Sequence, residues 1–297
     1  MDRSLVEKEK RLHGSAALPI ALYDNYRFFP QFSKRLLFLH WHDEAEFVLI
    51  RKGAVRLQVD GSEYNLRKGD AAQVPSGAIH TAVSANGRDF WYDAIVFSVN
   101  FLTSGVSDIT QLQYIGRIKL RQLQLPILIS TRQAWGRGVV RELMDLIEAA
   151  RRKAPGYELA LKGSLFKAFS ILVSKGSVTP DAAHRKYRDL HRLKFVIQYI
   201  HENYAQKLTL HDLAALSNLS KYYFCRFFKE CIGRSPVEYL HSCRLLKSEQ
   251  LLKDTNLKVV DIAYEVGFTD LSHFIRLFHK ATGVSPSLFR NRNQTAI

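Results

Sequence analysis

The last hundred residues contain the same motif twice. The stretch LTLHDLAALSNLSKYYFCRFFKECIGRSPVEYL, from Leu208, aligns with LKVVDIAYEVGFTDLSHFIRLFHKATGVSPSLFR, from Leu257. Asp212, Leu213 and Ala214 match Asp261, Ile262 and Ala263 at an offset of 49 residues, and Phe224, Arg226, Phe228, Gly233, Ser235 and Pro236 match Phe274, Arg276, Phe278, Gly283, Ser285 and Pro286 at an offset of 50. Chance does not readily produce so many matches. This part of the chain is therefore expected to fold as two copies of one unit.

Each copy predicts a helix-turn-helix. A short first helix leads to a turn that needs a positive φ, and Asn218 in the first copy and Gly267 in the second supply it, since both residue types tolerate this conformation. The next helix is expected to start at a capping hydroxyl, Ser220 or Thr269, whose oxygen accepts from a free backbone N–H. Two such units in succession are typical of a module that reads DNA.

The second helix of each copy has a buried and an outward face. If the phenylalanines at positions 224, 227 and 228, and residues 274, 277 and 278, lie in the core, other side chains must face outward. In the first copy these are Lys221, Tyr222, Cys225, Arg226 and Lys229, and in the second Ser272, Ile275, Arg276 and His279. A single exposed arginine is usually a solvated surface charge. Arginines at equivalent positions of two repeated motifs instead favour pairing with guanine in the major groove.

The C-terminal part, from about Leu190 to Arg290, resembles the AraC/XylS family of bacterial transcription regulators. The signature is IAYEVGFTDLSHFIRLFHKATGVSPSLFR. The resemblance implies seven helices, with two helix-turn-helix units joined by a long central helix, SPVEYLHSCRLLKSEQLLKD. It also implies that both recognition helices enter successive major grooves, about 34 Å apart, on one face of the duplex. Tyr222 and Cys225 depart from the polar readers that the family often has there.

The region from Leu36 to about Val99 has the pattern of short strands and turns. In AVRLQVDGSEYNL, apolar residues alternate with polar ones up to Asp60-Gly61, a pair that favours a hairpin turn. Two helical patterns follow, WGRGVVRELMDLIEAARRK and YELALKGSLFKAFSILVSKG, separated by Pro155-Gly156. The fold class predicted is α+β in two domains, a β-barrel with a helical pair and an all-α double helix-turn-helix.

A cluster of potential metal ligands lies in the first strands of this barrel. His40 and His42 share one face of a strand, and Glu46 has the same parity if the strand runs through. Together with GDAAQVPSGAIH, which ends at His80, the pattern resembles the two cupin motifs. That resemblance implies a cupin-like, arabinose-binding-type sensing barrel, in which these four positions match the metal ligands of cupin enzymes. Ser84 stands where the second motif usually has asparagine.

Three interpretations of the cluster remain open. It is a metal centre of three histidines and one carboxylate, a polar ring that hydrogen-bonds an effector, or a set of internally satisfied residues. We adopt the second interpretation, a pocket for a small-molecule effector. The nearby aromatic residues could stack on a sugar, so a carbohydrate is one candidate effector. No catalytic residue and no cofactor are expected. The candidate effector-binding residues are His40, Trp41, His42, Glu46, His80 and Trp91, and a divalent metal, if bound, would use His40, His42, Glu46 and His80.

The expected domain order follows from these patterns. Residues 1–20 are an N-terminal arm, 21–132 the cupin-like barrel, 133–175 a helical dimerisation segment, 176–189 a polar linker, and 190–297 the DNA-binding domain. A net charge of +15 favours a polyanionic partner. The three cysteines, Cys225, Cys231 and Cys243, form no CxxC pair and are expected to be reduced.

The prediction is a cytoplasmic bacterial regulator, at the nucleoid when bound to DNA, because neither a membrane span nor a signal peptide is evident. Its expected partners are double-stranded operator DNA, a small-molecule effector, a second copy in a homodimer and, for an activator, RNA polymerase, but no membrane. It is not expected to be an enzyme. The alternatives are a metal-dependent cupin enzyme with a helical appendage and a nucleic-acid binder driven by charge alone.

Overall fold

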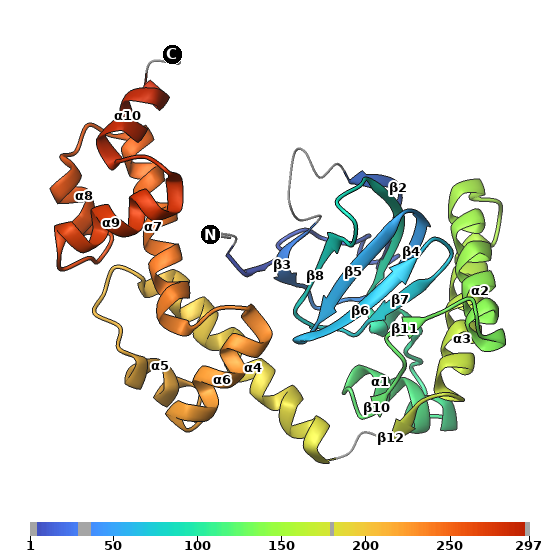
Figure 1. Cartoon of the computed structure of the whole chain (residues 1–297). Helices are drawn as coiled ribbons and strands as arrows, with labels where there is room; N and C mark the ends of the chain where they lie inside the picture. Colours follow the sequence, from blue (N-terminus) through green and yellow to red (C-terminus); the bar gives the residue numbers. More distant parts are fainter. Residues whose placement is uncertain (1–4, 29–36, 179–180, 295–297) are drawn as a thin grey trace. The chain divides into compact units, whose positions relative to one another are not determined.

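The computed structural model describes residues 5–28, 37–178 and 181–294 (Figure 1). The chain divides into two compact units. One runs from Glu7 to Tyr187, and the other contains Arg188 to the C-terminal helix together with Val6. This two-domain α+β architecture is the fold class that the sequence predicts.

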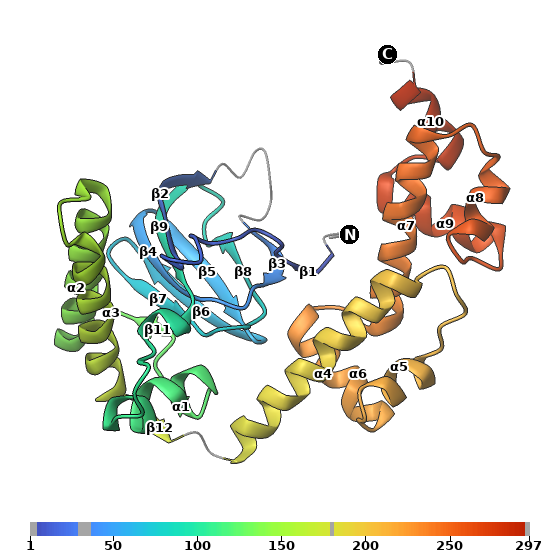
Figure 2. The same ribbon diagram turned by 180° about the vertical axis from the view of Figure 1, so that it is seen from behind.

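The sheet-rich unit is built from two five-stranded sheets. Their orders are β1-β3-β8-β5-β6 and β11-β7-β4-β9-β2. The strands are β1 (Glu7–Lys8), β2 (Ile20–Phe28), β3 (Leu37–Trp41), β4 (Ala45–Lys52), β5 (Ala54–Val59), β6 (Ser62–Arg67), β7 (Ala71–Val74), β8 (His80–Ser84), β9 (Phe90–Phe97) and β11 (Leu128–Ile129). Figures 1 and 2 show the strands wrapping into a barrel.

Strand β4 shows how alternation builds this barrel. Successive side chains of a strand point to opposite faces. Phe47 and Leu49 lie in the core beneath the covering helices, whereas Val48 and Ile50 belong to the second core, inside the barrel. Glu46 shares the parity of Val48 and Ile50, so the strand directs a carboxylate into the barrel interior.

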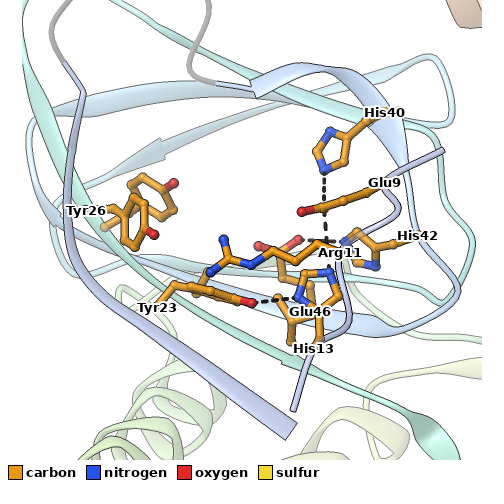
Figure 3. A pocket seen from close by; sticks show the side chains of 11 residues that line it. Glu9, Arg11, His13, Tyr23, Tyr26, His40, His42 and Glu46 are labelled. Atoms are coloured by element: carbon orange, nitrogen blue, oxygen red, sulfur yellow. Dashed lines mark hydrogen bonds and ion pairs between the residues drawn. The ribbon is translucent and has the colours of Figure 1, made fainter. Parts of the chain in front are cut away.

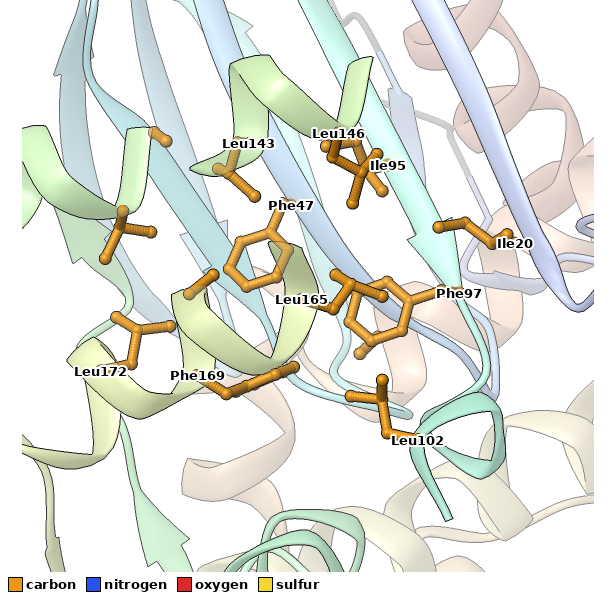
Figure 4. Packing of buried hydrophobic residues seen from close by; sticks show 14 of the residues in the cluster. Ile20, Phe47, Ile95, Phe97, Leu102, Leu143, Leu146, Leu165, Phe169 and Leu172 are labelled. Atoms are coloured by element: carbon orange, nitrogen blue, oxygen red, sulfur yellow. The ribbon is translucent and has the colours of Figure 1, made fainter. Parts of the chain in front are cut away.

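Two helices, α2 (Ala134–Arg152) and α3 (Tyr157–Val173), cover one sheet of the barrel. Phe169 of α3 packs on Phe47 and Phe97, with ring centroids 5.6 and 6.0 Å away (Figure 4). Each buried phenylalanine of this kind contributes about 1.5–3 kcal/mol through removal of apolar surface from water. The helical pair therefore stabilises the barrel, whatever else it contacts.

The region between barrel and helices contains short elements that the alternation pattern does not reveal. They are the 3-10 helix η1 (Val99–Leu102), the π-helical turn η2 (Gln111–Ile115), α1 (Gly116–Lys119) and β10 (Leu123–Gln124). Strand β10 pairs antiparallel with β12 (Ser177–Val178). Strand β12 and the start of helix α4 (Asp181–Asn203) both lie inside the predicted linker, residues 176–189. The linker prediction relied on missing apolar periodicity, but a segment that contains good helix formers such as Ala, Arg and Lys can form a helical turn without it.

The described residues of the helical region form seven helices, α4 to α10. After α4 these are α5 (Leu210–Leu216), α6 (Lys221–Ile232), α7 (Pro236–Asp254), α8 (Val259–Glu265), α9 (Leu271–Thr282) and α10 (Pro286–Gln294). The pairs α5–α6 and α8–α9 are the two helix-turn-helix units, and α7 joins them (Figure 1). In α7 the Ser235 hydroxyl caps the first turn, and Pro236 occupies a position where a missing N–H costs nothing.

The two turns have the predicted backbone conformation, since φ is +51° at Asn218 and +94° at Gly267. The first predicted cap is also confirmed, because the Ser220 hydroxyl accepts from the backbone N–H of Tyr223. The second prediction, Thr269, is wrong by one residue. The carboxylate of Asp270 caps α9 by accepting from His273, and Asp is as good a cap as any hydroxyl.

Candidate functional site: an outward helix face and a buried histidine cluster

The recognition helices α6 and α9 are fixed by phenylalanines that are almost completely buried. Phe224 and Phe228 in α6 and Phe274 and Phe278 in α9 are all fully enclosed. Their burial leaves the opposite face of each helix to solvent. On that face the structure exposes Lys221, Tyr222, Arg226 and Lys229 of α6, with Cys225 half-buried, and Ser272, Ile275, Arg276 and His279 of α9.

The face of α6 carries aromatic rings close to its arginine. The Arg226 guanidinium lies 5.5 Å from the ring of Tyr223 and 6.0 Å from that of Tyr222. Tyr222 itself is 78% exposed. An arginine held over aromatic rings loses less conformational freedom on binding than a free one. This geometry suits a planar donor presented to a base edge.

The histidine cluster of the barrel results from strand pairing. His40 of β3 and His80 of β8 are directly opposite each other in the antiparallel register. Directly opposite side chains lie close together, and the two ring centroids are 4.2 Å apart. His42 follows β3, with its ring 5.0 Å from that of His80. The pattern of four ligand-type residues predicted from sequence is therefore brought together in space.

Glu46 lies beside two of these imidazoles. Its Oε2 is 3.4 Å from Nε2 of His42 and 3.2 Å from Nε2 of His80, and the carboxylate is buried. Burial by itself would raise the pKa of Glu46, but hydrogen bonds and positive charge from His42 and His80 lower it well below the ordinary value. The carboxylate is thus kept charged in an enclosed site, which requires cationic neighbours.

The N-terminal segment contributes residues that the sequence motifs did not indicate. Strand β1 pairs parallel with β3, and the Glu9 N–H donates to the Trp41 carbonyl at 2.9 Å. One Glu9 carboxylate oxygen lies 3.6 Å from Nε2 of His40 and 3.6 Å from Nε2 of His13 (Figure 3). The hydrogen bond with His13 is the main cause that lowers the pKa of Glu9.

A cavity of about 90 Å³ lies among these groups. The residues that line it are Glu9, Arg11, His13, Tyr23, Tyr26, His40, His42, Glu46, Tyr92, Ala94 and Val96. His40, His42 and Glu46 therefore lie where the effector prediction placed them, and His80 packs directly behind them. The cavity lies at one end of the barrel interior, next to the apolar core.

Two tryptophans of the effector prediction do not line the cavity. Trp41 stands between His40 and His42, so its side chain takes the opposite face of the strand. Trp91 has the opposite parity to Tyr92, a lining residue, and its ring faces the charged groups of Arg27 and Lys52 at 5.4 and 5.7 Å. Both are packing residues of the barrel wall. The aromatic residues that line the cavity, apart from histidines, are Tyr23, Tyr26 and Tyr92.

The cluster is chemically able to hold a metal ion. Ligand nitrogens of His40, His42 and His80 lie within 4.8 Å of one another. Around one zinc-like ion such nitrogens lie within about 3–4 Å, so side-chain shifts of about 1 Å bring them into range. Within the described part of the chain, Nε2 of His80 and Nδ1 of His42 are buried without a hydrogen-bond partner. Free nitrogens and a charged carboxylate are what such an ion requires.

The comparisons with known proteins agree with this architecture. Residues 24–169 match the AraC-like ligand binding domain and residues 213–292 a helix-turn-helix domain. YdeC of Bacillus subtilis, described as an HTH-type transcriptional regulator, is 29% identical over 289 residues, 96% of either chain. The HTH-type transcriptional activator RhaR of Pectobacterium carotovorum is 27% identical over 254 residues, 86% of either chain.

Among solved structures, ToxT from Vibrio cholerae matches 92% of this chain and 98% of its own, with 16% identity and a TM-score of 0.42. A barrel with a cavity lined by histidine and carboxylate side chains and a double helix-turn-helix together define a transcription regulator of the ligand-sensing class. The chain belongs to the AraC family of these regulators. The comparisons give no support to the alternative of a cupin enzyme. In the described ranges, no helix is long and apolar enough to span a membrane.

Proposed function

We propose that the protein reads a specific operator through the outward faces of α6 and α9. The observation that carries this proposal is the equivalence of Arg226 and Arg276, which occupy the same exposed position in two copies of one motif. Each is positioned for bidentate pairing with guanine, while the neighbouring Lys229 and His279 are positioned for phosphate or base contacts. Sequence preference, rather than charge alone, is the expected property.

Binding to an operator selected from random double-stranded DNA tests this proposal. Arg226→Ala or Arg276→Ala is expected to weaken specific binding by about 1–3 kcal/mol in mobility-shift titrations, because each removes one base-reading contact. Arg141→Ala is the matched control, since that exposed arginine lies on α2. Unchanged operator affinity in both recognition-helix variants would overturn the assignment of these residues.

The cavity in the barrel is proposed as the effector site. Pockets for small molecules usually enclose about 300–1,000 Å³, whereas this cavity has about 90 Å³ while Glu9, Arg11 and His13 line it. A sugar-sized effector therefore requires part of the N-terminal segment to move. Tyr23, Tyr26 and Tyr92 would then offer aromatic faces and hydroxyl groups, in keeping with the prediction of a carbohydrate.

A thermal-shift screen of small molecules tests the effector proposal. A ligand that binds only the folded protein raises its midpoint of unfolding, and His40→Ala is expected to abolish that shift. The same variant should bind the operator normally in the absence of effector, because His40 belongs to the barrel. Equal loss of folding stability and of operator binding would instead assign His40 a structural role.

The protein is further proposed to act as a homodimer in the bacterial cytoplasm, at the nucleoid when bound to DNA, and to contact RNA polymerase if it activates. Support for a dimer comes from α2 and α3, which bury one face on the barrel but leave large apolar side chains in solvent. Met144 is 45% and Leu159 76% exposed. Sedimentation tests this proposal. The wild type is expected to sediment as a dimer and Leu159→Asp as a monomer. A monomeric wild type would contradict the proposal.

A further inference from the structure

The N-terminal segment places a carboxylate on the open side of the histidine cluster. Glu9 is held there by its backbone bond to Trp41 and by its contacts with His13 and His40. His13 is fixed in turn, because its Nδ1 lies 2.9 Å from the Tyr23 hydroxyl (Figure 3). The position of Glu9 therefore results from a connected set of contacts and not from a single flexible side chain.

Among the described residues, two imidazoles of the cluster each have a buried nitrogen without a hydrogen-bond partner, Nδ1 of His42 and Nε2 of His80. His80 Nδ1 is 2.9 Å from the carbonyl of Ala78, and a carbonyl only accepts, so this nitrogen carries a proton. Nε2 of the same ring faces the Glu46 carboxylate at 3.2 Å. Without a metal ion, a proton on Nε2 supplies the positive charge between them, and a bound metal ion would replace that proton. A backbone carbonyl that fixes the tautomer of a histidine is the usual outer support of a metal ligand.

The size and donor set of the site select the kind of cation. About 90 Å³ is enough for an ion with one or two waters, but too small for most organic effectors. Imidazole nitrogens combined with carboxylate oxygens suit zinc, iron, cobalt, nickel or manganese rather than calcium or magnesium. We propose that Glu9 joins His40, His42 and His80 as a ligand of a divalent transition-metal ion, so that the ion fastens the N-terminal segment to the barrel.

Glu46 and His13 have supporting parts in this arrangement. Glu46 neutralises charge from inside the barrel, and His13 orients the Glu9 carboxylate from outside. Occupancy of the site ties residues 7–13 to β3, and loss of the ion releases them. Any effect of the ion on DNA binding rests on the proposed function of the barrel as the sensing domain. Ion binding itself and the ordering of residues 7–13 do not rest on it.

The test uses the full chain, freed of metal by chelation and titrated with Co²⁺ alone. Wild-type protein is expected to bind one ion per chain, with a visible absorption band that reports nitrogen and oxygen ligands. Glu9→Gln, which keeps the shape but removes the charge, is expected to lower the affinity at least about tenfold. Glu7→Gln is the matched control, because Glu7 is exposed in the same segment and does not line the cavity.

Hydrogen exchange of residues 7–13 provides the second measurement. Saturating Co²⁺ is expected to slow exchange of this segment about tenfold in the wild type and in Glu7→Gln, but not in Glu9→Gln. Three results would each overturn the proposal. The wild type does not bind Co²⁺ stoichiometrically, Glu9→Gln binds it as tightly as the wild type, or the exchange rate of the segment does not change when Co²⁺ is added. Operator binding by the same metal-free protein reports separately on the proposed function.

Discussion

The two helix-turn-helix units have different residues at the same turn position. Both turns need a positive φ, and the chain has Asn218 in the first and Gly267 in the second. The difference has a physical cause in the second copy. A Cβ on Gly267 would lie 2.6 Å from the Ala205 carbonyl oxygen, closer than any side chain tolerates. The second turn packs against the chain between α4 and α5, and only glycine allows that approach.

A buried arginine strengthens the same contact. Arg244 of α7 donates from Nε to the Tyr204 carbonyl and from Nη2 to the Gln206 carbonyl, at 2.8 Å each. Its guanidinium also lies 5.6 Å from the ring of Phe268, next to Gly267. The comparison teaches that the second unit depends on residues 204–206 for its position. Changes at this contact should therefore affect the second copy more than equivalent changes affect the first.

The largest expected effect is that of Gly267→Ala. A left-handed conformation forced on alanine costs about 1–2 kcal/mol, and the clash with Ala205 brings the total loss of stability to about 3 kcal/mol. Gly233→Ala is the matched control, because Gly233 also has a positive φ but has open space around its Cα. Denaturant unfolding should show a loss of only about 1 kcal/mol there. Equal losses at both glycines would contradict the proposed docking of the second turn.

Acid should weaken the second unit through His241. Burial lowers the pKa of His241 to about 4, and the charges of His273 and Arg244 add to this, against a smaller opposite effect of Glu238. Since the folded pKa lies below the unfolded value of about 6.5, the unfolded chain takes up the proton first, and stability falls as pH drops from about 6.5 to about 4.

The expected loss from His241 is about 1–2 kcal/mol, because partial solvent exposure of the ring screens the effect. Hydrogen exchange at pH 7.5 and pH 5 should show faster opening of α8 and α9 at the lower pH. His241→Phe should reduce this pH dependence, since the ring already stacks on Phe268 with centroids 5.7 Å apart. Equal acid sensitivity in α5 and α6 would break the comparison between the two units.

The smallest effects concern the helix caps. Removal of a capping side chain costs about 1 kcal/mol, so Asp270→Ala and Ser220→Ala should destabilise the protein to a similar extent. Thr269→Ala should have little effect, because the carboxylate of Asp270 accepts the N–H of His273. Thermal unfolding of the three variants measures the difference. A larger loss for Thr269→Ala than for Asp270→Ala would restore the original prediction from the sequence.

Features with a local or repeated signal could be predicted from the sequence. The two copies align residue by residue, so Asn218 and Gly267 were identified as turn residues without coordinates. The parity of His40 and His42 likewise predicted a common face. The parity of Glu46 applied only if one strand ran through, and the structure instead places Glu46 on β4, in the other sheet. The same parity rule places Trp41 on the opposite face, and Trp41 does not line the cavity.

Glu9, Arg11 and His13 could not be found in this way. They reach the cavity because β1 pairs with β3, a strand that begins thirty residues after β1, and such pairing leaves no local pattern in the chain. The early start of α4 could not be predicted for a different reason, since its first residues carry no apolar periodicity. Long-range strand pairing and helix ends without apolar periodicity are the parts of this fold that local sequence patterns do not reveal.

Operator selection with single-arginine variants tests the central claim most directly. Wild-type protein is expected to select two short half-sites whose centres lie about 10 base pairs apart, one for each recognition helix. Arg226→Ala should relax base preference in one half-site only, and Arg276→Ala in the other only. Loss of preference at the same half-site in both variants, or no preference by the wild type at physiological salt, would contradict a regulator that reads DNA with both copies of its repeated motif.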